Sequence, residues 1–181
     1  MRIVKTPIDG FLILEPKVYE DSRGFFLETF QEESYKERGV IDHFVQDNQS
    51  TSNFGVLRGL HYQVGEMAQA KLVRPLQGSI LDIVVDVRKD SKTFGKHFSI
   101  ILDDIFQQQL FVPRGFAHGF ITLSPTSTFA YKCDNFYDKD SERGIIYNDA
   151  TLSLDWHLPK DKFILSEKDQ ILPTFLEATS E

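Results

Sequence analysis

The chain has 181 residues, a formal net charge of −7 and a pI of about 5.2, with 41% hydrophobic and 26% charged residues. This length and composition predict one globular domain over residues 1–181, with a sizeable core to which 16 phenylalanines contribute. The acidic balance argues against a general nucleic-acid-binding protein, because such binding depends on basic surface. The single cysteine, Cys133, excludes an intrachain disulfide, and the sequence has no Cys/His cluster with zinc-site spacing.

The N-terminal segment MRIVKTPIDGFLILEP holds only four consecutive apolar residues before Glu15, which is too few for the apolar region of a signal peptide. No later stretch approaches the length of a membrane span. We therefore expect a cytoplasmic protein that has neither a membrane nor a nucleic acid as its partner.

The predicted elements are mostly short strands separated by Gly, Pro, Asp or Asn. In chain order they are FLILE (11–15), FFLETF (25–30), HFVQDNQS (43–50), VLRGLHYQ (56–63), AKLVRPL (70–76), ILDIVVDVR (80–88), HFSIIL (97–102), QQLFVP (108–113), HGFITL (118–123) and TFAYKCDNFY (128–137). Helix-like segments are confined to about residues 32–38 and to the last third of the chain. This pattern predicts a mainly β fold, which we expect to be a jelly-roll β-sandwich. Its core would span about residues 40–140, with N-terminal strands and a C-terminal helical segment packed on it.

The segment ILDIVVDVR alternates strictly between two faces. One face carries Leu81, Ile83, Val85 and Val87, and the other carries Asp82 and Asp86 together with Ile80 and Val84. This alternation predicts a strand with one dry face. A carboxylate beside so many valines needs a polar partner if it approaches a dry interior.

Two segments resemble the cupin superfamily, whose jelly rolls hold a metal ion through an HxH pair and a further histidine. The second cupin motif is present as Pro113, Gly115 and His118 in PRGFAHGF. The first is not, because Gln63 stands where the second histidine of a pair beginning at His61 belongs. Since a metal site usually needs three or four convergent ligands, we expect a cupin-like pocket without metal.

Nine segments resemble, in order, successive motifs of the dTDP-4-dehydrorhamnose 3,5-epimerase family: DSRGFFLETF, FVQDN, VLRGLHYQ, KLVR, GSILDIVVDVRKDSKTFGK, FVPRGFAHGF, YKCDNFY, IIYND and LSEKD. They cover nearly the whole chain. The resemblance implies a dTDP-linked 4-keto-6-deoxy sugar as substrate and inversion of C3 and C5 through an enolate, without a cofactor. The product would be dTDP-4-dehydro-L-rhamnose. The sequence has no GxGxxG, Walker A or GxSxG motif, which agrees with proton transfer by side chains alone.

The resemblance also implies the catalytic residues. His61 is the base, and an unperturbed imidazole, with a pKa of about 6.5, is partly or mostly neutral at cellular pH. Asp169 would hold the second nitrogen of that imidazole. Lys71 would stabilise the enolate oxygen, and Tyr131 would return a proton from the opposite face.

Three of these residues, Asp169, Lys71 and Tyr131, also have a simpler interpretation. Ser166 and Asp169 have the spacing of a helix capping box, in which the acid only bonds the backbone. Lys71 fits a surface charge at a strand start, and Tyr131 fits a core aromatic residue. Two further residues are candidates for supporting roles. His118 would help to bind the enolate oxygen or serve as an ordinary core histidine, and Asp82 would orient Lys71 or face solvent.

Seven residues are predicted to bind the substrate. By resemblance, the nucleotide contacts Arg23, Phe26 and Glu28, the sugar and phosphates contact Gln46 and Asn48, the diphosphate contacts Arg58, and Tyr137 lines the pocket beside Tyr131. In the family the RGFF segment enters the neighbouring subunit's pocket, which implies a homodimer with a shared active site. Without the resemblance, Arg23 is interpreted as a turn charge before a strand, and Phe26 and Tyr137 are interpreted as core aromatic residues.

The spacing of Arg58 and His61 raises a geometric difficulty. Residues three apart on a regular strand face opposite ways, whereas both of these are assigned to one pocket. Gly59 lies between them and is the expected position of a bulge. The sequence leaves several activities open: inversion of C3 alone or C5 alone, isomerisation of the keto group, a metal-dependent cupin oxygenase, and a non-catalytic nucleotide-sugar-binding module.

Overall fold

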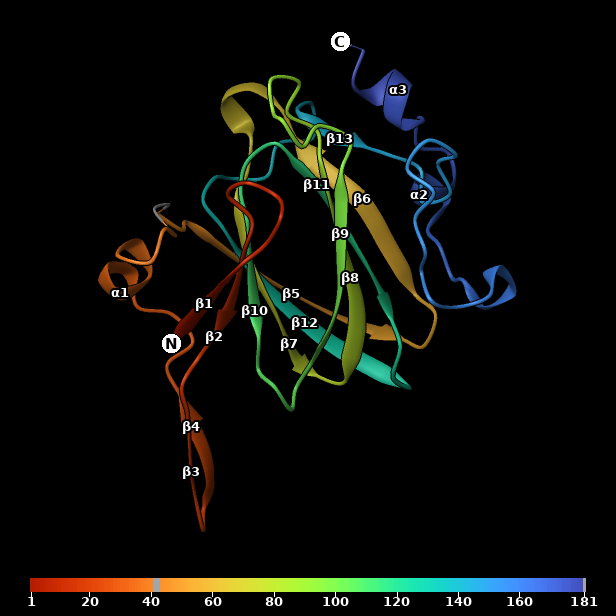
Figure 1. The fold of residues 1–181 in the computed structure, drawn as a ribbon. Coiled ribbons are helices and arrows are strands. Elements are labelled where there is room, and N and C mark those ends of the chain that lie inside the picture. The colour runs from red at the N-terminus through yellow and green to blue at the C-terminus, as the bar shows by residue number, and fades with distance from the viewer. Residues whose placement is uncertain (41–42, 181) are drawn as a thin grey trace.

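The strand-forming segments assemble into two antiparallel sheets that face each other in the computed structural model, which describes residues 1–40 and 43–180 (Figure 1). The six-stranded sheet has the order β1 (Arg2–Lys5), β2 (Leu12–Glu15), β10 (Gln109–Val112), β7 (Lys71–Gln77), β12 (Thr126–Cys133) and β5 (Gln46–Asn53). The five-stranded sheet has the order β13 (Glu142–Gly144), β6 (Leu57–Gln63), β11 (Phe116–Thr122), β8 (Ser79–Asp86) and β9 (His97–Asp103). The prediction of a mainly β sandwich is confirmed.

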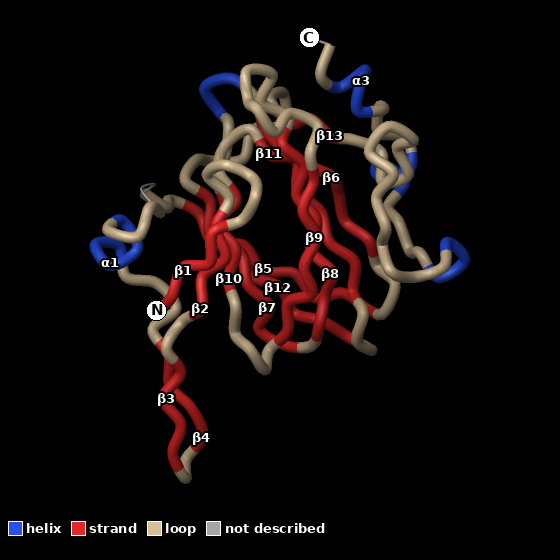
Figure 2. The backbone as a smooth tube through the Cα atoms, viewed as in Figure 1, coloured by secondary structure: helices blue, strands red, loops and turns tan. Residues whose placement is uncertain are grey.

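Short helices lie outside the two sheets, as Figure 2 shows. They are α1 (Glu32–Lys36), α2 (Glu167–Gln170) and α3 (Phe175–Ala178), with single 3-10 turns at Gly65–Met67 and Lys160–Lys162. The three α-helices and the turn at Lys160–Lys162 lie in the helix-like segments of the sequence, whereas the turn at Gly65–Met67 was not predicted. In the described ranges no helix has both the length and the apolar character that crossing a membrane requires.

Three strands were not predicted, namely β1, β13 and β3 (Val18–Asp21). Each has only three or four residues, so its alternation is too short to recognise. The predicted segment 128–137 also ends early, because β12 stops at Cys133 and the chain continues as a loop. Strand β3 pairs with β4 (Gly24–Leu27) to form a two-stranded hairpin that projects away from the sandwich (Figure 1).

Strand β8 is buried on both faces, so the expectation of one dry face was wrong. Its inner face contributes Ile80 and Val84 to the core between the sheets. Its outer face contributes aliphatic residues that pack against Trp156 and Phe175 of the C-terminal segment. The last third of the chain, which is mostly loop, therefore covers the outer face of the five-stranded sheet and keeps it dry.

Strand β6 has an irregularity at the predicted position. His61 lies opposite His118 of β11, and Arg58 lies opposite Phe120, so three steps along β6 match two steps along β11. Between them Gly59 adopts a φ of +126°, which L side chains rarely adopt. The extra residue forms a bulge, and Arg58 and His61 consequently line the same cavity.

Replacing Gly59 by alanine tests this bulge. A Cβ at this position would lie 2.5 Å from the Cα of Gly119 and 2.9 Å from the carbonyl oxygen of His118. We expect Gly59→Ala to lower the free energy of unfolding by about 2–4 kcal/mol, because backbone atoms of β11 must shift. Urea denaturation measures the change.

Gly65→Ala is the matched control. Gly65 also has a positive φ, of 64°, but a Cβ there would meet no atom within 4 Å. Gly65→Ala should lower the free energy of unfolding by about 1 kcal/mol, and this loss should come from backbone conformation alone. Equal losses in the two variants would contradict the close approach of β6 and β11.

Candidate active site

A cavity of about 450 Å³ lies between the two sheets and brings together all five residues that the sequence assigned to proton transfer and enolate binding. The five-stranded sheet supplies His61 from β6 and His118 from β11. The six-stranded sheet supplies Lys71 from β7 and Tyr131 from β12. Asp169 reaches the cavity from α2, beside β6.

His61 and Asp169 form a hydrogen-bonded pair. The Nε2 of His61 lies 2.7 Å from Oδ1 of Asp169, whose side chain is 5% exposed, whereas that of His61 is 29% exposed. Burial raises the pKa of the Asp169 carboxyl. The hydrogen bond and charge of His61, with smaller contributions from Gly59 and Ser166, outweigh burial and lower this pKa below its ordinary value. The ionised carboxylate accepts a hydrogen bond from Nε2–H, which leaves Nδ1 of His61 for a ligand.

The capping interpretation of Ser166 and Asp169 is half right. Ser166 is the N-cap of α2, and its side chain accepts a hydrogen bond from the backbone N–H of Asp169 at 3.1 Å. The carboxylate of Asp169, however, turns to His61 rather than back to the N-cap. The helix start therefore fixes the backbone of the residue whose side chain holds the imidazole.

His118 and Asp82 form a second pair. Nε2 of His118 lies 2.8 Å from Oδ2 of Asp82, and both side chains are buried. The expectation that Asp82 orients Lys71 is corrected, because its hydrogen bond goes to His118 on the adjacent strand. In the described part of the chain, the second oxygen of Asp82 is the one buried side-chain polar atom without a hydrogen-bond partner.

Lys71 and Tyr131 lie close together on the opposite wall, with the ammonium of Lys71 6.0 Å from the ring centroid of Tyr131. Burial lowers the pKa of Lys71, and the electrostatic influence of Cys133, Asp82 and Glu142 only partly opposes it. Burial likewise raises the pKa of the Tyr131 phenol above its ordinary value. Among the described residues neither the ammonium nor the phenol hydroxyl has a hydrogen-bond partner, so both are available to a ligand.

A smaller cavity of about 180 Å³ adjoins the first and shares His61, Lys71 and Tyr131 with it. It brings in three of the predicted binding residues, Gln46, Asn48 and Tyr137. Gln46 and Asn48 share one face of β5 and are hydrogen-bonded to each other at 3.1 Å. Tyr137 lies in the loop after β12, so its position does not follow from the even spacing on a strand that the sequence suggested.

Arg58 is exposed at the main cavity, and its Nε donates a hydrogen bond to Ser52 Oγ at 3.1 Å. The sequence analysis missed two charged neighbours of the cavities, Lys168 and Glu142. Lys168 Nζ lies 2.5 Å from Glu142 Oε2, and the hydroxyl of Tyr137 donates to the same oxygen at 3.0 Å. Glu142 follows no recognisable pattern in the sequence, because its three-residue strand joins β6 only through tertiary pairing.

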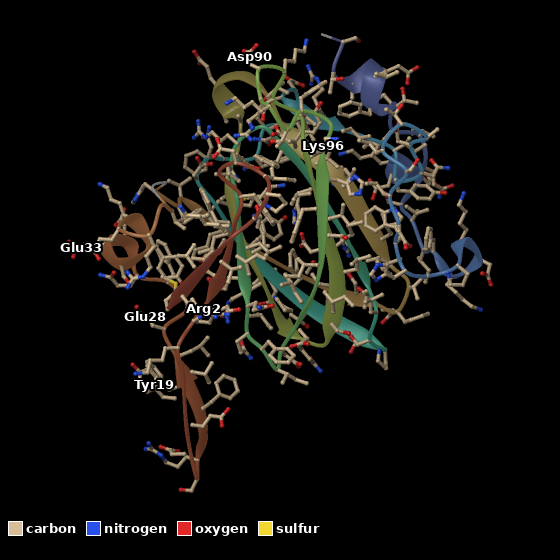
Figure 3. All side chains as sticks on the ribbon, in the orientation of Figure 1. Arg2, Tyr19, Glu28, Glu33, Asp90 and Lys96 are labelled. Atoms are coloured by element: carbon tan, nitrogen blue, oxygen red, sulfur yellow. The ribbon has the colours of Figure 1, made fainter. Side chains whose placement is uncertain are left out.

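The remaining predicted binding residues, Arg23, Phe26 and Glu28, do not line either cavity of their own chain. Arg23 and Phe26 lie on the β3–β4 hairpin, and Arg23 bonds Asp21 at the hairpin tip. Figure 3 shows Glu28 near the base of this hairpin and Tyr19 farther along it. Phe26 is 69% exposed.

Gln63, which replaces the second histidine of the cupin motif, serves a structural purpose. Its side-chain nitrogen donates to the backbone carbonyls of Met67 and Phe136, and its oxygen accepts from the backbone N–H of Asp138. Over residues 1–40 and 43–180, no group of three or more His, Cys, Asp or Glu side chains is placed to hold a metal ion.

Comparisons with known proteins agree with this geometry. Residues 5–177 match the family model described as dTDP-4-dehydrorhamnose 3,5-epimerase. The dTDP-4-dehydrorhamnose 3,5-epimerase of Shigella flexneri is 47% identical over 179 residues, which cover 98% of each chain.

Two crystal structures are similar over nearly the full length. The dTDP-4-dehydrorhamnose 3,5-epimerase from Elizabethkingia anophelis NUHP1 has a TM-score of 0.93 and 51% identity, covering 99% of this chain and 98% of the other. The dTDP-6-deoxy-D-glucose-3,5-epimerase from Legionella pneumophila Philadelphia 1, in complex with dTDP-4-keto-L-rhamnose, has a TM-score of 0.92 and 47% identity, covering 96% and 92%. The match over residues 5–177 and these identities show that the chain belongs to the dTDP-4-dehydrorhamnose 3,5-epimerase family.

Proposed function

We propose that the protein inverts C3 and C5 of dTDP-4-dehydro-6-deoxy-D-glucose to give dTDP-4-dehydro-L-rhamnose, by proton transfer between its own side chains and the sugar. One observation carries the assignment of roles. A histidine held by a carboxylate lies on one wall of the cavity, and a phenol lies on the wall opposite. Full-length similarity to epimerases of this family supports the reaction itself.

His61 is the proposed base. The C–H bonds at C3 and C5 are acidic because the resulting carbanion delocalises onto the C4 oxygen as an enolate. Asp169 accepts a hydrogen bond from Nε2–H of His61, so the lone pair on Nδ1 is free to remove the sugar proton. The imidazolium that forms gains a buried ion-pair partner at 2.7 Å, which stabilises it.

Lys71 and His118 are the proposed donors to the enolate oxygen. The Lys71 ammonium has its donors unused, and its surroundings are largely desolvated, which makes its attraction to a developing negative charge stronger than in water. His118 donates Nε2–H to Asp82, so donation from Nδ1 requires the doubly protonated ring, whose charge Asp82 balances. Each such donor is worth about 10²- to 10³-fold in rate in comparable sites.

Tyr131 is the proposed acid. Inversion requires the new proton to arrive from the face opposite to the one from which His61 removed the old proton. Tyr131 belongs to the six-stranded sheet and His61 to the five-stranded sheet, so a sugar ring between the walls has one group on each face. Its raised pKa keeps the phenol protonated at neutral pH.

Incubation with dTDP-4-dehydro-6-deoxy-D-glucose in heavy water tests the proposed function. We expect deuterium at both C3 and C5, detected by NMR. His61→Asn should lower the exchange at both carbons by about 10²- to 10⁴-fold, because no base remains. His97→Asn, which changes an exposed histidine on β9, is the control and should exchange at the wild-type rate. Deuterium at only one carbon would indicate an epimerase that inverts that carbon alone. Binding of the sugar nucleotide without any incorporated deuterium would indicate a binding module.

The alkaline pH dependence distinguishes Lys71 from Tyr131. Burial lowers the pKa of Lys71 below its ordinary value, whereas it raises the pKa of Tyr131 above its ordinary value. We expect kcat/KM to fall at a pH below the value of about 10.4 for a free lysine. In Lys71→Arg the charge persists, so this decline should move to higher pH although the neutral-pH rate drops.

The matched control for this profile is Lys132→Arg. Lys132 is on the strand beside β7 and pairs with Asp47 outside the main cavity. Its variant should keep the wild-type profile. An alkaline decline that stays in place in Lys71→Arg would contradict the role of Lys71.

We also propose a homodimer in which the β3–β4 hairpin completes the nucleotide site of the partner. The hairpin makes no strand pairing with the two main sheets, and a two-stranded hairpin alone is marginally stable in water. It exposes three aromatic side chains, those of Tyr19, Phe25 and Phe26, by 54–69%. Arg23 at its tip carries the planar donor group that suits a phosphate.

Mixed dimers test this arrangement. Arg23→Ala and His61→Asn are each expected to be nearly inactive alone. If the hairpin acts on the partner subunit, one site of every hybrid dimer is intact, so refolding an equal mixture should restore about a quarter of wild-type kcat/KM. A hairpin that acts on its own chain would restore nothing.

Two further expectations stay predictions. The first is independence of cofactors, since inversion at C3 and C5 leaves the oxidation level of the sugar unchanged. Stoichiometric iron in the purified active protein would contradict it. The second is the cytoplasmic location, which cell fractionation tests.

A further inference from the structure

Two phenylalanines that the proposed mechanism does not use form one wall of the main cavity, which we call the aromatic floor: Phe120 and Phe129. Phe120 follows His118 by two residues on β11, and Phe129 precedes Tyr131 by two residues on β12. Because alternate residues of a strand share a face, each phenylalanine points to the same side as one of these reacting groups. Both line the cavity, although they are only 5% and 1% exposed.

The two rings meet across the space between the sheets. Their centroids are 4.5 Å apart with an interplanar angle of 41°. The ring of Phe129 also lies 6.2 Å from that of His118 and 6.1 Å from that of Tyr131. Behind the rings is the apolar core between the sheets, to which both residues belong. The aromatic floor therefore separates the reacting groups from the core.

The floor has no hydrogen-bonding atoms. Three polar side chains are in register with it: Ser50 of β5 pairs with Phe129, and Arg58 of β6 and Asp82 of β8 pair with Phe120. Asp82 does not line the cavity. A hydroxyl group placed against the two rings would lose its hydrogen bonds to water without replacement, which is unfavourable. A methyl group placed there would gain from burial.

The substrate class named under the proposed function, on which this inference rests, has one such apolar substituent. The sugar carries a diphosphate at C1, hydroxyls at C2 and C3, a ketone at C4 and a methyl group, C6, on C5. We propose that the aromatic floor binds the C6 methyl group and selects 6-deoxy sugars over 6-hydroxy sugars. Because C6 is bonded to C5, its contact with the floor also holds C5 between His61 and Tyr131.

The size of the selection follows from the kind of pocket. An apolar pocket rejects an analogue with one added hydroxyl by about 10²-fold at most. The preference for the 6-deoxy sugar should accordingly be about 10- to 100-fold. Replacing one ring of the floor by leucine opens room for the hydroxyl and a water molecule, so the preference should fall below about 5-fold.

Calorimetric titration with two unreactive ligands, dTDP-6-deoxy-D-glucose and dTDP-D-glucose, measures this preference without turnover. Wild-type protein, Phe120→Leu and Phe129→Leu are compared with Phe116→Leu. Phe116 is on the same strand as Phe120, two residues before His118, and belongs to the same core cluster, but it does not line the cavity. Phe116→Leu should therefore lose similar apolar contact and keep the wild-type preference.

Exchange in heavy water supplies a second measurement. With the 6-deoxy 4-keto substrate, Phe120→Leu and Phe129→Leu should slow exchange at C5 at least about 5-fold more than at C3, because the methyl group positions C5. The two proposals fail differently. If the wild-type protein prefers the 6-deoxy ligand but exchanges no proton, the proposed reaction is wrong and the proposed role of the aromatic floor is supported.

Equal affinity of the wild-type protein for the two ligands would contradict selection by the aromatic floor, even if neither leucine variant folds. An equal loss of preference in Phe116→Leu would also overturn it.

Discussion

The hydrogen bond between His61 and Asp169 joins parts of the chain that are 108 residues apart, and the site depends on it. The carboxylate is buried, and a buried charge is tolerated only when it is paired. Asp169 can reach His61 because the C-terminal segment is attached to the edge of β6. Leu60 and Ile145 exchange two backbone hydrogen bonds, and the backbone N–H of Leu57 donates to the carbonyl oxygen of Ile164. The segment that covers the five-stranded sheet is therefore also part of the active site.

The interior between the sheets is divided by chemistry. The polar part of the cavity wall consists of His61, His118, Lys71 and Tyr131. The aromatic floor is the adjacent apolar part, two residues farther along β11 and two residues earlier along β12. His118 has a buried carboxylate partner, whereas the Lys71 ammonium is left for a ligand. A sandwich can hold such groups because its two sheets shield the cavity between them from bulk water.

The jelly-roll architecture by itself does not determine the chemistry, since one fold can support unrelated reactions. In this chain Gln63 holds the loops around Met67 and Phe136 at a position where a metal-binding cupin has a ligand. The cavity instead presents an imidazole, an ammonium and a phenol, which suit proton transfer and enolate binding. This chemistry agrees with membership of the dTDP-4-dehydrorhamnose 3,5-epimerase family.

Local pattern and motif resemblance together determined much of this protein. Period-two alternation and turn residues identified most strands, the spacing of Arg58 and His61 around Gly59 located the bulge, and motif resemblance named the residues that meet in the cavity. Only the tertiary structure decided that β8 has two dry faces and that Asp82 bonds His118. It also decided that Glu142 lies at the site and that the β3–β4 hairpin lies away from the cavities of its own chain. The physical reason is that these features depend on strand register and on packing between residues distant in sequence, which a local alternation of polar and apolar residues does not encode.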